Sequence, residues 1–442
     1  MKEKVFIKFL IVLVVVVLLV PLSHSWAAPE VSYAIKGAKV YTLAGSPIDN
    51  ATVVIKNGKI EAVGNSVSVP TGAKVIDARG LEVYPGLFDS ATQLGLIEIE
   101  SISATVDTAD IATYNPQLVA ATAINPNSEH IPVARANGIT HALSAPGLPA
   151  VASGTGPTIG GQASAINLSG WVIDEMLIDR SAAMVINWPT FATGSFDFTT
   201  FQFRQRPFNE VKQEYEKRVA ELANLLNQAR HYSQAVEKGS LQKFERDLKL
   251  EALIPVIRGE KPVMVFANDD RLIKSAVEFC EKQKLKMILT GGAEAWKVKD
   301  LLKEKNIPVI LRPTQSMPTD EDEAYDKPYS TAGELSAAGV KIAIATFNSA
   351  DSRTLAQEAG HAVPYGLPRE EALKAITIYP AEIFGLSDKL GTIEKGKIAN
   401  IIVTTGDPLE IRNEVKYLFI NGKLTSLDNK HFQLYEKYRQ RN

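Results

Sequence analysis

The sequence predicts an α/β protein in which a (β/α)8 barrel occupies the middle of the chain and both termini build a small β-sandwich. Three observations predict it. The chain of 442 residues is long enough for one large domain and a smaller one. Its middle alternates short apolar runs with helical patterns, as buried parallel strands and their crossover helices do. Short β-like runs with turn signals lie before and after this region, too few at either end to close a sheet alone.

The first 27 residues have the pattern of a signal peptide. Lysines precede the uninterrupted apolar run 9–20, which is shorter than the about 20 residues that span a bilayer. Ser25 and Ala27 then supply the small residues at positions −3 and −1 of a cleavage site. We therefore expect a periplasmic or secreted protein, cleaved near Ala27, with no stable membrane span in the mature chain. An uncleaved segment would instead anchor the protein in the membrane.

Residues 28–83 predict the first part of the sandwich. Short β-like runs follow one another there, and Asn57-Gly58 marks a tight hairpin turn. Residues 386–442 have the same character and repeat the turn signal at Asn421-Gly422. Because neither set has enough strands to cover its own edges, we expect the two ends to combine in one sandwich.

Residues 84–385 predict the barrel. Six runs rich in apolar residues are strand candidates: 139–143, 183–187, 262–267, 286–290, 307–311 and 341–345. Helical patterns such as 270–284 and 368–377 separate many of them, and 209–238 has the longest one. Repeated units of this length favour a TIM-like (β/α)8 barrel over a doubly wound sheet.

Charge and cysteine content exclude some classes of function. The formal net charge is -2 and no extended basic block occurs, so a nucleic-acid partner is not expected. Cys280 is the only cysteine, which excludes an intrachain disulfide. It lies in a helical pattern and reads as a small buried apolar residue.

The stretch Pro85-Gly-Leu-Phe-Asp89 opens the barrel region, and Ala91 and Gln93 follow it at alternate positions. It resembles Pro-Gly-Leu-(Ile/Phe)-Asp-x-His-x-His, the end of barrel strand 1 in the metal-dependent amidohydrolase superfamily. Further stretches are similar to the imidazolonepropionase-like group of that superfamily, namely 128–140, 292–297, 365–377 and 391–401. The resemblance covers nearly the whole mature chain and implies a (β/α)8 barrel. It therefore supports the barrel over the doubly wound sheet, as the alternating pattern does.

The resemblance also implies a Zn²⁺ or similar ion. Two strand-1 histidines, histidines at the ends of strands 5 and 6, and an aspartate after strand 8 would hold it, with the aspartate as general base. On the same resemblance these positions here are Ala91, Gln93, Phe266, Gly291 (or Thr290, one position earlier) and Asn348. Ala, Phe and Gly have no donor atom, and Gln and Asn offer only neutral amide oxygens. We therefore expect no metal cofactor and no catalytic residues there.

Two interpretations of the barrel mouth stay open. His141, Asp89 and Asp351 are fallback candidates for a rebuilt metal site, with Zn²⁺ as the alternative cofactor. Without a metal, we expect a polar pocket at the C-terminal mouth of the barrel. It would contain Asp89, Gln93, Asn268, Thr290, Asn348 and Asp351.

Two functions follow from these interpretations. The first is an exported protein of this family that has lost its metal centre. It would bind a small-molecule ligand or pair, as a subunit, with a second copy or with a catalytically intact relative. The second is a metal-dependent hydrolase that acts on C–N bonds, in cyclic amide-like rather than peptide substrates, with a non-standard metal site.

Overall fold

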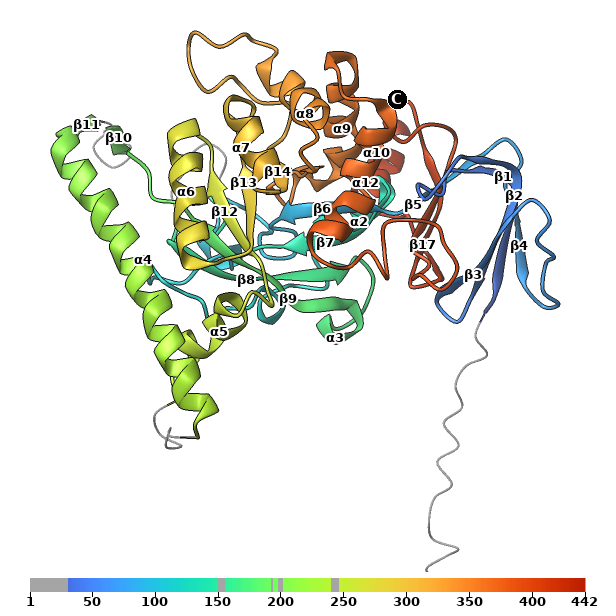
Figure 1. The fold of residues 1–442 in the computed structure, drawn as a ribbon. Helices are drawn as coiled ribbons and strands as arrows, with labels where there is room; N and C mark the ends of the chain where they lie inside the picture. The colour runs from blue at the N-terminus through green and yellow to red at the C-terminus, as the bar shows by residue number, and fades with distance from the viewer. Residues whose placement is uncertain (1–30, 150–155, 192–193, 198–201, 240–245, 442) are drawn as a thin grey trace, which may run out of the picture.

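The computed structural model describes residues 31–149, 156–191, 194–197, 202–239 and 246–441. These residues form a barrel-like sheet in the centre and a second sheet at one side (Figure 1). The predicted signal segment lies outside the described residues. Within the part of the chain that is described, no helix combines the length and the apolar character needed to cross a lipid bilayer.

The central sheet has eight strands in the order β15-β14-β13-β12-β9-β8-β7-β6. The strands are β6 (Leu87–Thr92), β7 (Ile139–Ser144), β8 (Ile159–Asn167), β9 (Leu177–Asn187), β12 (Val263–Ala267), β13 (Met287–Gly291), β14 (Val309–Leu311) and β15 (Ile342–Ile344). The Phe347 amide donates to the Ala91 carbonyl at 2.8 Å, which brings the two ends of the sheet together. The predicted (β/α)8 barrel is confirmed.

One strand departs from the all-parallel pattern. β8 runs antiparallel to β7 and to β9, whereas β6 pairs parallel with β7, and the strands from β9 to β15 are parallel. The link between β8 and β9 holds only a single helical turn, α3 (Ile173–Met176). A parallel connection needs a crossover of about a dozen residues or more, so this short link returns the chain in the opposite direction.

Helices pack around the barrel and carry its connections (Figure 1). They are α2 (His130–Ala136), α4 (Phe208–Glu237), α5 (Leu248–Ile257), α6 (Asp270–Gln283), α7 (Lys299–Glu304), α8 (Lys327–Ala337), α9 (Leu355–Ala362), α10 (Arg369–Ala375), α11 (Ile378–Ile383) and α12 (Lys430–Arg439). The start of α6 shows how the sequence sets a boundary, because Asp269 accepts from the Arg271 and Leu272 amides at 2.9 and 3.2 Å. Cys280 is buried on α6, as its helical pattern predicts.

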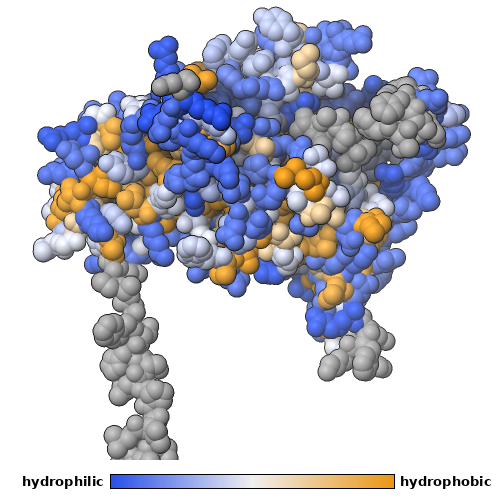
Figure 2. All heavy atoms as spheres, turned by 180° about the vertical axis from the view of Figure 1, so that it is seen from behind, coloured by the Kyte–Doolittle hydropathy of each residue, from blue (hydrophilic) through white to orange (hydrophobic). Residues whose placement is uncertain are grey.

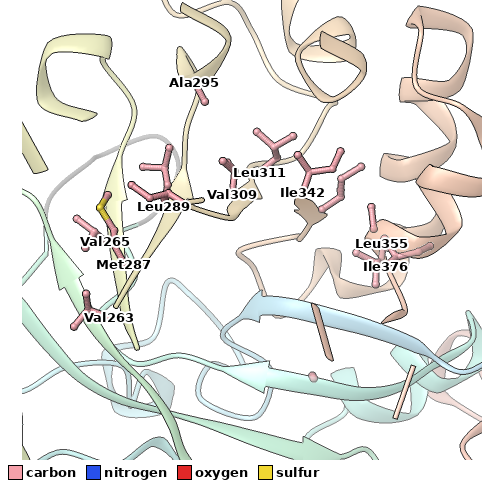
Figure 3. Packing of buried hydrophobic residues seen from close by; sticks show 14 of the residues in the cluster. Val263, Val265, Met287, Leu289, Ala295, Val309, Leu311, Ile342, Leu355 and Ile376 are labelled. Atoms are coloured by element: carbon pink, nitrogen blue, oxygen red, sulfur yellow. The ribbon is translucent and has the colours of Figure 1, made fainter. Parts of the chain in front are cut away.

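Strands β12 to β15 are largely apolar on both faces, and the barrel strands contribute to two separate cores. Residues such as Val265, Leu289 and Val309 face the surrounding helices and form the outer cluster (Figure 3). Their neighbours in the strands form the inner cluster, which fills the barrel: Phe88, Met264, Ile288, Ile310 and Ala343. This alternation decides which side chains face the barrel axis.

The second sheet combines both ends of the chain, as predicted. Its order is β18-β17-β16-β5-β1-β2-β3, with β4 beside β1. The strands are β1 (Tyr33–Val40), β2 (Ile48–Lys56), β3 (Lys59–Gly64), β4 (Lys74–Asp77), β5 (Glu82–Pro85), β16 (Ile401–Thr404), β17 (Val415–Ile420) and β18 (Lys423–Thr425). The junction between the two ends is antiparallel pairing of β5 with β16.

The two Asn-Gly turns of this sheet contact each other. Asn57 and Gly58 have φ values of 54° and 74°, and Asn421 and Gly422 have 51° and 70°, which are the left-handed conformations that a two-residue hairpin turn requires. A Cβ on Gly422 would lie 2.6 Å from the Gly58 Cα, so only glycine permits this approach.

The surface of the molecule that is turned away from the viewer in Figure 1 is mostly hydrophilic. Its hydrophobic side chains lie in several separate spots (Figure 2).

Candidate functional site

Asp89 is fully buried on β6, at the end of the stretch that resembles strand 1 of the family. Its carboxylate accepts from the Thr346 amide at 3.2 Å and from the Thr346 hydroxyl at 2.5 Å. Burial raises the pKa of Asp89 to about 7, although the hydrogen bonds from Thr346 act to lower it. Asp89 therefore joins β6 to the segment after β15, across the closure of the barrel.

Ala91 and Gln93 occupy the predicted histidine positions. Ala91 is fully buried within the inner cluster, so the first of these positions contributes no polar atom. Gln93 is also buried, and its side-chain amide donates to the Leu148 carbonyl at 3.2 Å. The Ala91 side chain thus packs inside the inner cluster, and the Gln93 side chain is hydrogen-bonded to the backbone after β7.

Two aromatic rings fill the space beside Ala91. Phe266, near the end of β12, packs against the inner cluster, and Phe347 belongs to it. Their ring centroids lie 6.1 Å apart at an interplanar angle of 67°. Phe347 has a φ of 59°, which a bulky residue rarely adopts, and its side chain is only 1% exposed. Packing of the ring therefore holds a strained backbone at this position.

Alternation along β13 resolves which residue of strand 6 faces the axis. Ile288 belongs to the inner cluster and Leu289 to the outer one, so Thr290 points inward beside its register partner Phe266. Thr290 is fully buried, and its hydroxyl has no hydrogen-bond partner. Thr290 and Asn187 of β9 are the two buried polar residues paired in register with Phe266.

Gly291, the other candidate for that position, is held in a conformation that favours glycine. Its φ is 93°, and an added Cβ would lie 2.7 Å from the Asn268 side-chain oxygen and 3.0 Å from the Phe266 ring. Asn268 itself accepts from the Ala293 amide at 3.3 Å and so orders the turn after β13. A histidine at position 291 would require this turn to move.

Asn348 stands at the predicted aspartate position, and its amide is fully used. The side-chain oxygen accepts from the Ala350 and Asp351 amides at 2.7 and 3.2 Å, and the side-chain nitrogen donates to Glu100 at 2.8 Å. An amide can accept on one side and donate on the other, whereas an ionised carboxylate only accepts. Asp351 begins the short 3-10 helix η4 (Asp351–Thr354) and is exposed.

His141 lies away from this group. Its ring is fully buried on β7, 2.6 Å from the Thr140 hydroxyl and next to Asn400 of the second sheet. The Phe88 ring lies 4.5 Å from it, and burial lowers the pKa of His141 to about 3. The structure therefore places His141 as a neutral core residue.

The fallback trio is not brought together. Among the described residues, the histidine, cysteine and carboxylate groups close enough to share a cation are Asp269, Asp270 and Glu294, and Glu294, Asp320 and Glu323. None of His141, Asp89 and Asp351 belongs to either group. The six residues of the expected polar pocket are also divided, because Asp89 is buried beneath Thr346 whereas Asp351 is exposed.

Sequence reasoning missed the carboxylate group around Glu294. Glu294 is 3% exposed, accepts from the Asp270 amide at 2.7 Å and pairs with Lys297 at 2.5 Å. Lys297 also lies 3.5 Å from Asp320 and from Glu323, so one ammonium group already compensates part of the negative charge of the cluster. The stretch 292–297 resembles the family and was the one signal that could have pointed to it.

The residues at the predicted ligand positions do not fit a zinc ion. They offer one buried hydroxyl, two amides that are already bonded and one aromatic ring, and they include no imidazole and no carboxylate. The carboxylates around Glu294 have the hard oxygen donors that suit Mg²⁺, Ca²⁺ or Mn²⁺. They lie in the turns after β12, β13 and β14 rather than in the inner cluster.

Known proteins resemble this chain in both sequence and fold. The model of the amidohydrolase family matches residues 286–425. Amidohydrolase tasK of Hapsidospora irregularis is 23% identical over 399 residues, which are 84% of this chain but only 39% of that protein. An imidazolonepropionase of Thermoplasma volcanium is 44% identical over 71 residues, 15% of this chain and 18% of that protein.

The structural comparison covers more of the chain. The crystal structure of an amidohydrolase from Thermotoga maritima MSB8 superposes with a TM-score of 0.75 and 25% sequence identity, over 89% of this chain and 99% of the other. By contrast, this chain spans less than half the length of the first curated relative that it matches. The matched region, the imidazolonepropionase relatives and the shared barrel agree with one another, and residues 286–425 form an amidohydrolase family domain.

Proposed function

We propose that this chain is an exported amidohydrolase-family protein that lacks the metal centre inside its barrel and binds a small-molecule ligand rather than hydrolysing one. The single observation that carries the proposal is the Phe266–Phe347 pair packed beside Ala91 in the inner cluster. A divalent ion at this place would lose its hydration among apolar side chains without gaining ligands, at a large cost in free energy.

The surroundings of the aromatic pair support the same proposal. Gly291 has no room for a side chain, and Asn348 already uses both ends of its amide to cap η4 and to bind Glu100. Thr290 supplies one unpaired hydroxyl, which is too little to hold a cation. Without a metal-activated water, the residues at the predicted ligand positions include no group that generates a hydroxide nucleophile at neutral pH.

A second candidate function is a metal-dependent hydrolase of C–N bonds with a non-standard metal site. The observation that favours it is the carboxylate group Glu294, Asp320 and Glu323. The amidohydrolase family domain favours it as well. An ion bound there would have to displace Lys297, whose ammonium group lies within 3.5 Å of all three carboxylates.

Metal analysis separates the two candidates. The purified chain would be treated with a mild chelator, reloaded with Zn²⁺, freed of excess metal and analysed by plasma mass spectrometry. We expect clearly less than one ion per chain. Near one tightly held ion per chain would overturn the proposal, and the Glu294→Gln variant tells where the ion sits. An ion lost in that variant belongs to the carboxylate group, whereas an ion that remains belongs to the barrel.

Export and partners are tested separately. The full-length chain, expressed in a Gram-negative host, should be recovered from the periplasm with Ala28 as its first residue, as N-terminal sequencing would report. Recovery of the intact N-terminus in the membrane fraction would indicate an anchor instead. Light scattering of the purified protein distinguishes a monomer from a homodimer, and the second copy or an intact relative remains the proposed subunit partner.

A further inference from the structure

A recess open to solvent lies at the edge of the barrel mouth, outside the inner cluster. We call it the rim pocket. It is bounded by the ends of β13 and β14, by the first turn of α8 and by the segment between β14 and α8, which Figure 1 shows beside one another. Lining residues include Leu311, Arg312, Met317, Glu323, Lys327 and Thr331. None of the predicted family ligand positions lines it.

Arg312 brings an unpaired positive charge into the rim pocket. It follows directly after β14, and its Nε is buried without a hydrogen-bond partner. In the part of the chain that the structure describes, no carboxylate forms an ion pair with its guanidinium group. Burial lowers the pKa of Arg312, and the more distant charge of Glu323 only partly opposes this effect. A buried guanidinium group without a partner is costly, so an anion in the pocket would be stabilised.

Glu323 brings a carboxylate oxygen that has no hydrogen bond into the same pocket. Its side chain is only 7% exposed. One carboxylate oxygen accepts from the Thr319 amide at 2.9 Å, whereas Oε1 has no hydrogen bond. The nearest cation to Oε1 is Lys297 at 3.5 Å, and Lys297 pairs more closely with Glu294 at 2.5 Å. A cationic N–H group in the pocket would find this oxygen available.

Lys327 fixes a third charge in the wall. Its ammonium group pairs with Glu334 at 2.7 Å and lies 3.8 Å from the centroid of the Trp296 ring. Because both contacts hold the lysine in place, it contributes positive potential without needing the ligand. The remaining wall is largely apolar and includes Leu311, Met317, Pro318 and Pro328.

The charges select the class of ligand. A simple anion would meet Glu323, and a simple cation would meet Arg312 and Lys327. A zwitterion satisfies both sides and leaves the net charge of the pocket unchanged. We propose that the rim pocket binds a free amino acid with an apolar side chain, its carboxylate on Arg312 and its ammonium group on Glu323. This inference rests on the ligand-binding part of the proposed function and deepens it, because the charged and apolar side chains that line the recess define the class of ligand.

Titration calorimetry of the full mature chain tests the inference with three probes of one shape. L-leucine carries both charged groups, 4-methylpentanoate lacks the ammonium group and 3-methylbutylamine lacks the carboxylate. We expect leucine to bind and the other two to bind at least about tenfold more weakly, since each loses a charge-assisted hydrogen bond. This comparison needs no variant. Absence of leucine binding, or equal binding of 4-methylpentanoate, overturns the inference.

Variants then assign the residues. Arg312→Met and Glu323→Gln should each weaken leucine binding about tenfold or more, and Arg312→Lys should weaken it less, because it keeps the charge. The matched control is Arg271→Met, which removes an exposed arginine that does not line the pocket and should bind leucine like the wild type. Unchanged leucine binding in a folded Arg312→Met variant contradicts the assignment. The metal content of the same samples keeps the two proposals separate. If leucine binds and one zinc ion per chain is found, only the proposal that the barrel holds no metal is contradicted.

Discussion

The rings of Phe266 and Phe347 meet edge to face inside the barrel, with centroids 6.1 Å apart and planes at 67°. Phe266 lies on β12, whereas Phe347 follows β15, and two strands separate β12 from β15 in the sheet. The pair therefore crosses the interior rather than linking neighbours. Its apolar volume is the main obstacle to any polar centre built there.

Restoring the two strand-1 histidines should not restore a metal site. The double variant Ala91→His, Gln93→His should bind no more Zn²⁺ than the wild type, because the remaining ligands are still absent. It should also lower the free energy of unfolding by about 1–3 kcal/mol, since Ala91 is completely enclosed. Metal analysis and urea unfolding measure the two effects. Stoichiometric zinc in the double variant would show that further ligands exist.

Phe347 should respond unusually to glycine. Phe347→Ala should destabilise the protein by about 3–5 kcal/mol through the cavity it leaves. Phe347→Gly should cost no more than Phe347→Ala, because glycine relieves the backbone strain at a φ of 59°. Phe266 is the control, since it lies in a regular strand. There glycine should be worse than alanine by about 0.5–1 kcal/mol.

Gly291→Ala tests the tight turn after β13. The new Cβ would lie 2.7 Å from the Asn268 side-chain oxygen at a φ of 93°, so we expect a loss of stability of at least about 1–2 kcal/mol. Gly45→Ala is the matched control, because nothing lies within 4 Å of its Cβ position. The midpoints of thermal unfolding of the two variants measure this loss. Equal midpoints would mean that the turn yields easily and that a side chain could be accepted at position 291.

Asn348→Asp should destabilise the protein rather than create a catalytic base. The new carboxylate would face Glu100, which now accepts from the Asn348 side chain at 2.8 Å. We expect a loss of about 0.5–2 kcal/mol. Adding Glu100→Gln should recover most of that loss, because the glutamine can donate to the new carboxylate. A double-mutant cycle in urea measures this coupling, and additive losses would contradict the contact.

Asp89 and His141 should give opposite pH dependences of stability. The native state raises the pKa of Asp89 from 3.8 to about 7, so it binds more protons than the unfolded chain in this range and loses stability as pH rises. It lowers the pKa of His141 from 6.5 to about 3, so there the unfolded chain binds more protons and stability rises with pH. Between about pH 4 and 6.5 the two contributions oppose each other.

Single variants separate these contributions. Asp89→Asn should leave the His141 contribution, so that the free energy of unfolding rises between about pH 4 and 6.5 more steeply than in the wild type. His141→Asn should leave the Asp89 contribution, so that the free energy of unfolding rises less than in the wild type, or falls, as the pH increases over this range. Each slope approaches about 1.4 kcal/mol per pH unit at most. Urea unfolding across this pH range provides the measurement, and parallel curves for all three proteins would contradict the assigned pKa shifts.

The fold could be predicted where local chemistry fixes it. Asn57-Gly58 and Asn421-Gly422 each dictate a tight turn, and their strands need partners from the other end. β8 was not among the predicted strands, because Ile159–Asn167 mixes glycine and polar residues with apolar ones and so gives no clear strand pattern. His141 was open between a core residue and a ligand, and only its neighbours in space decide for the core.

The candidate site was predictable only as an inventory of side chains. The absence of imidazoles at positions 91, 93 and 266 is visible in the sequence. The left-handed backbone of Phe347 is not, because tertiary packing rather than local preference sustains it. The same holds for the neighbours of Arg312 and Glu323, which come from segments whose contacts depend on the closed barrel.

The pairing of β5 with β16 has a consequence for how the molecule is made. β5 leaves the ribosome early but completes its hydrogen bonds only with a segment some three hundred residues later, Ile401 opposite Pro85. An N-terminal fragment must expose a row of unsatisfied amides and carbonyls until then. The two ends of the chain can therefore pair only when synthesis, and any passage through a translocation channel, is almost finished.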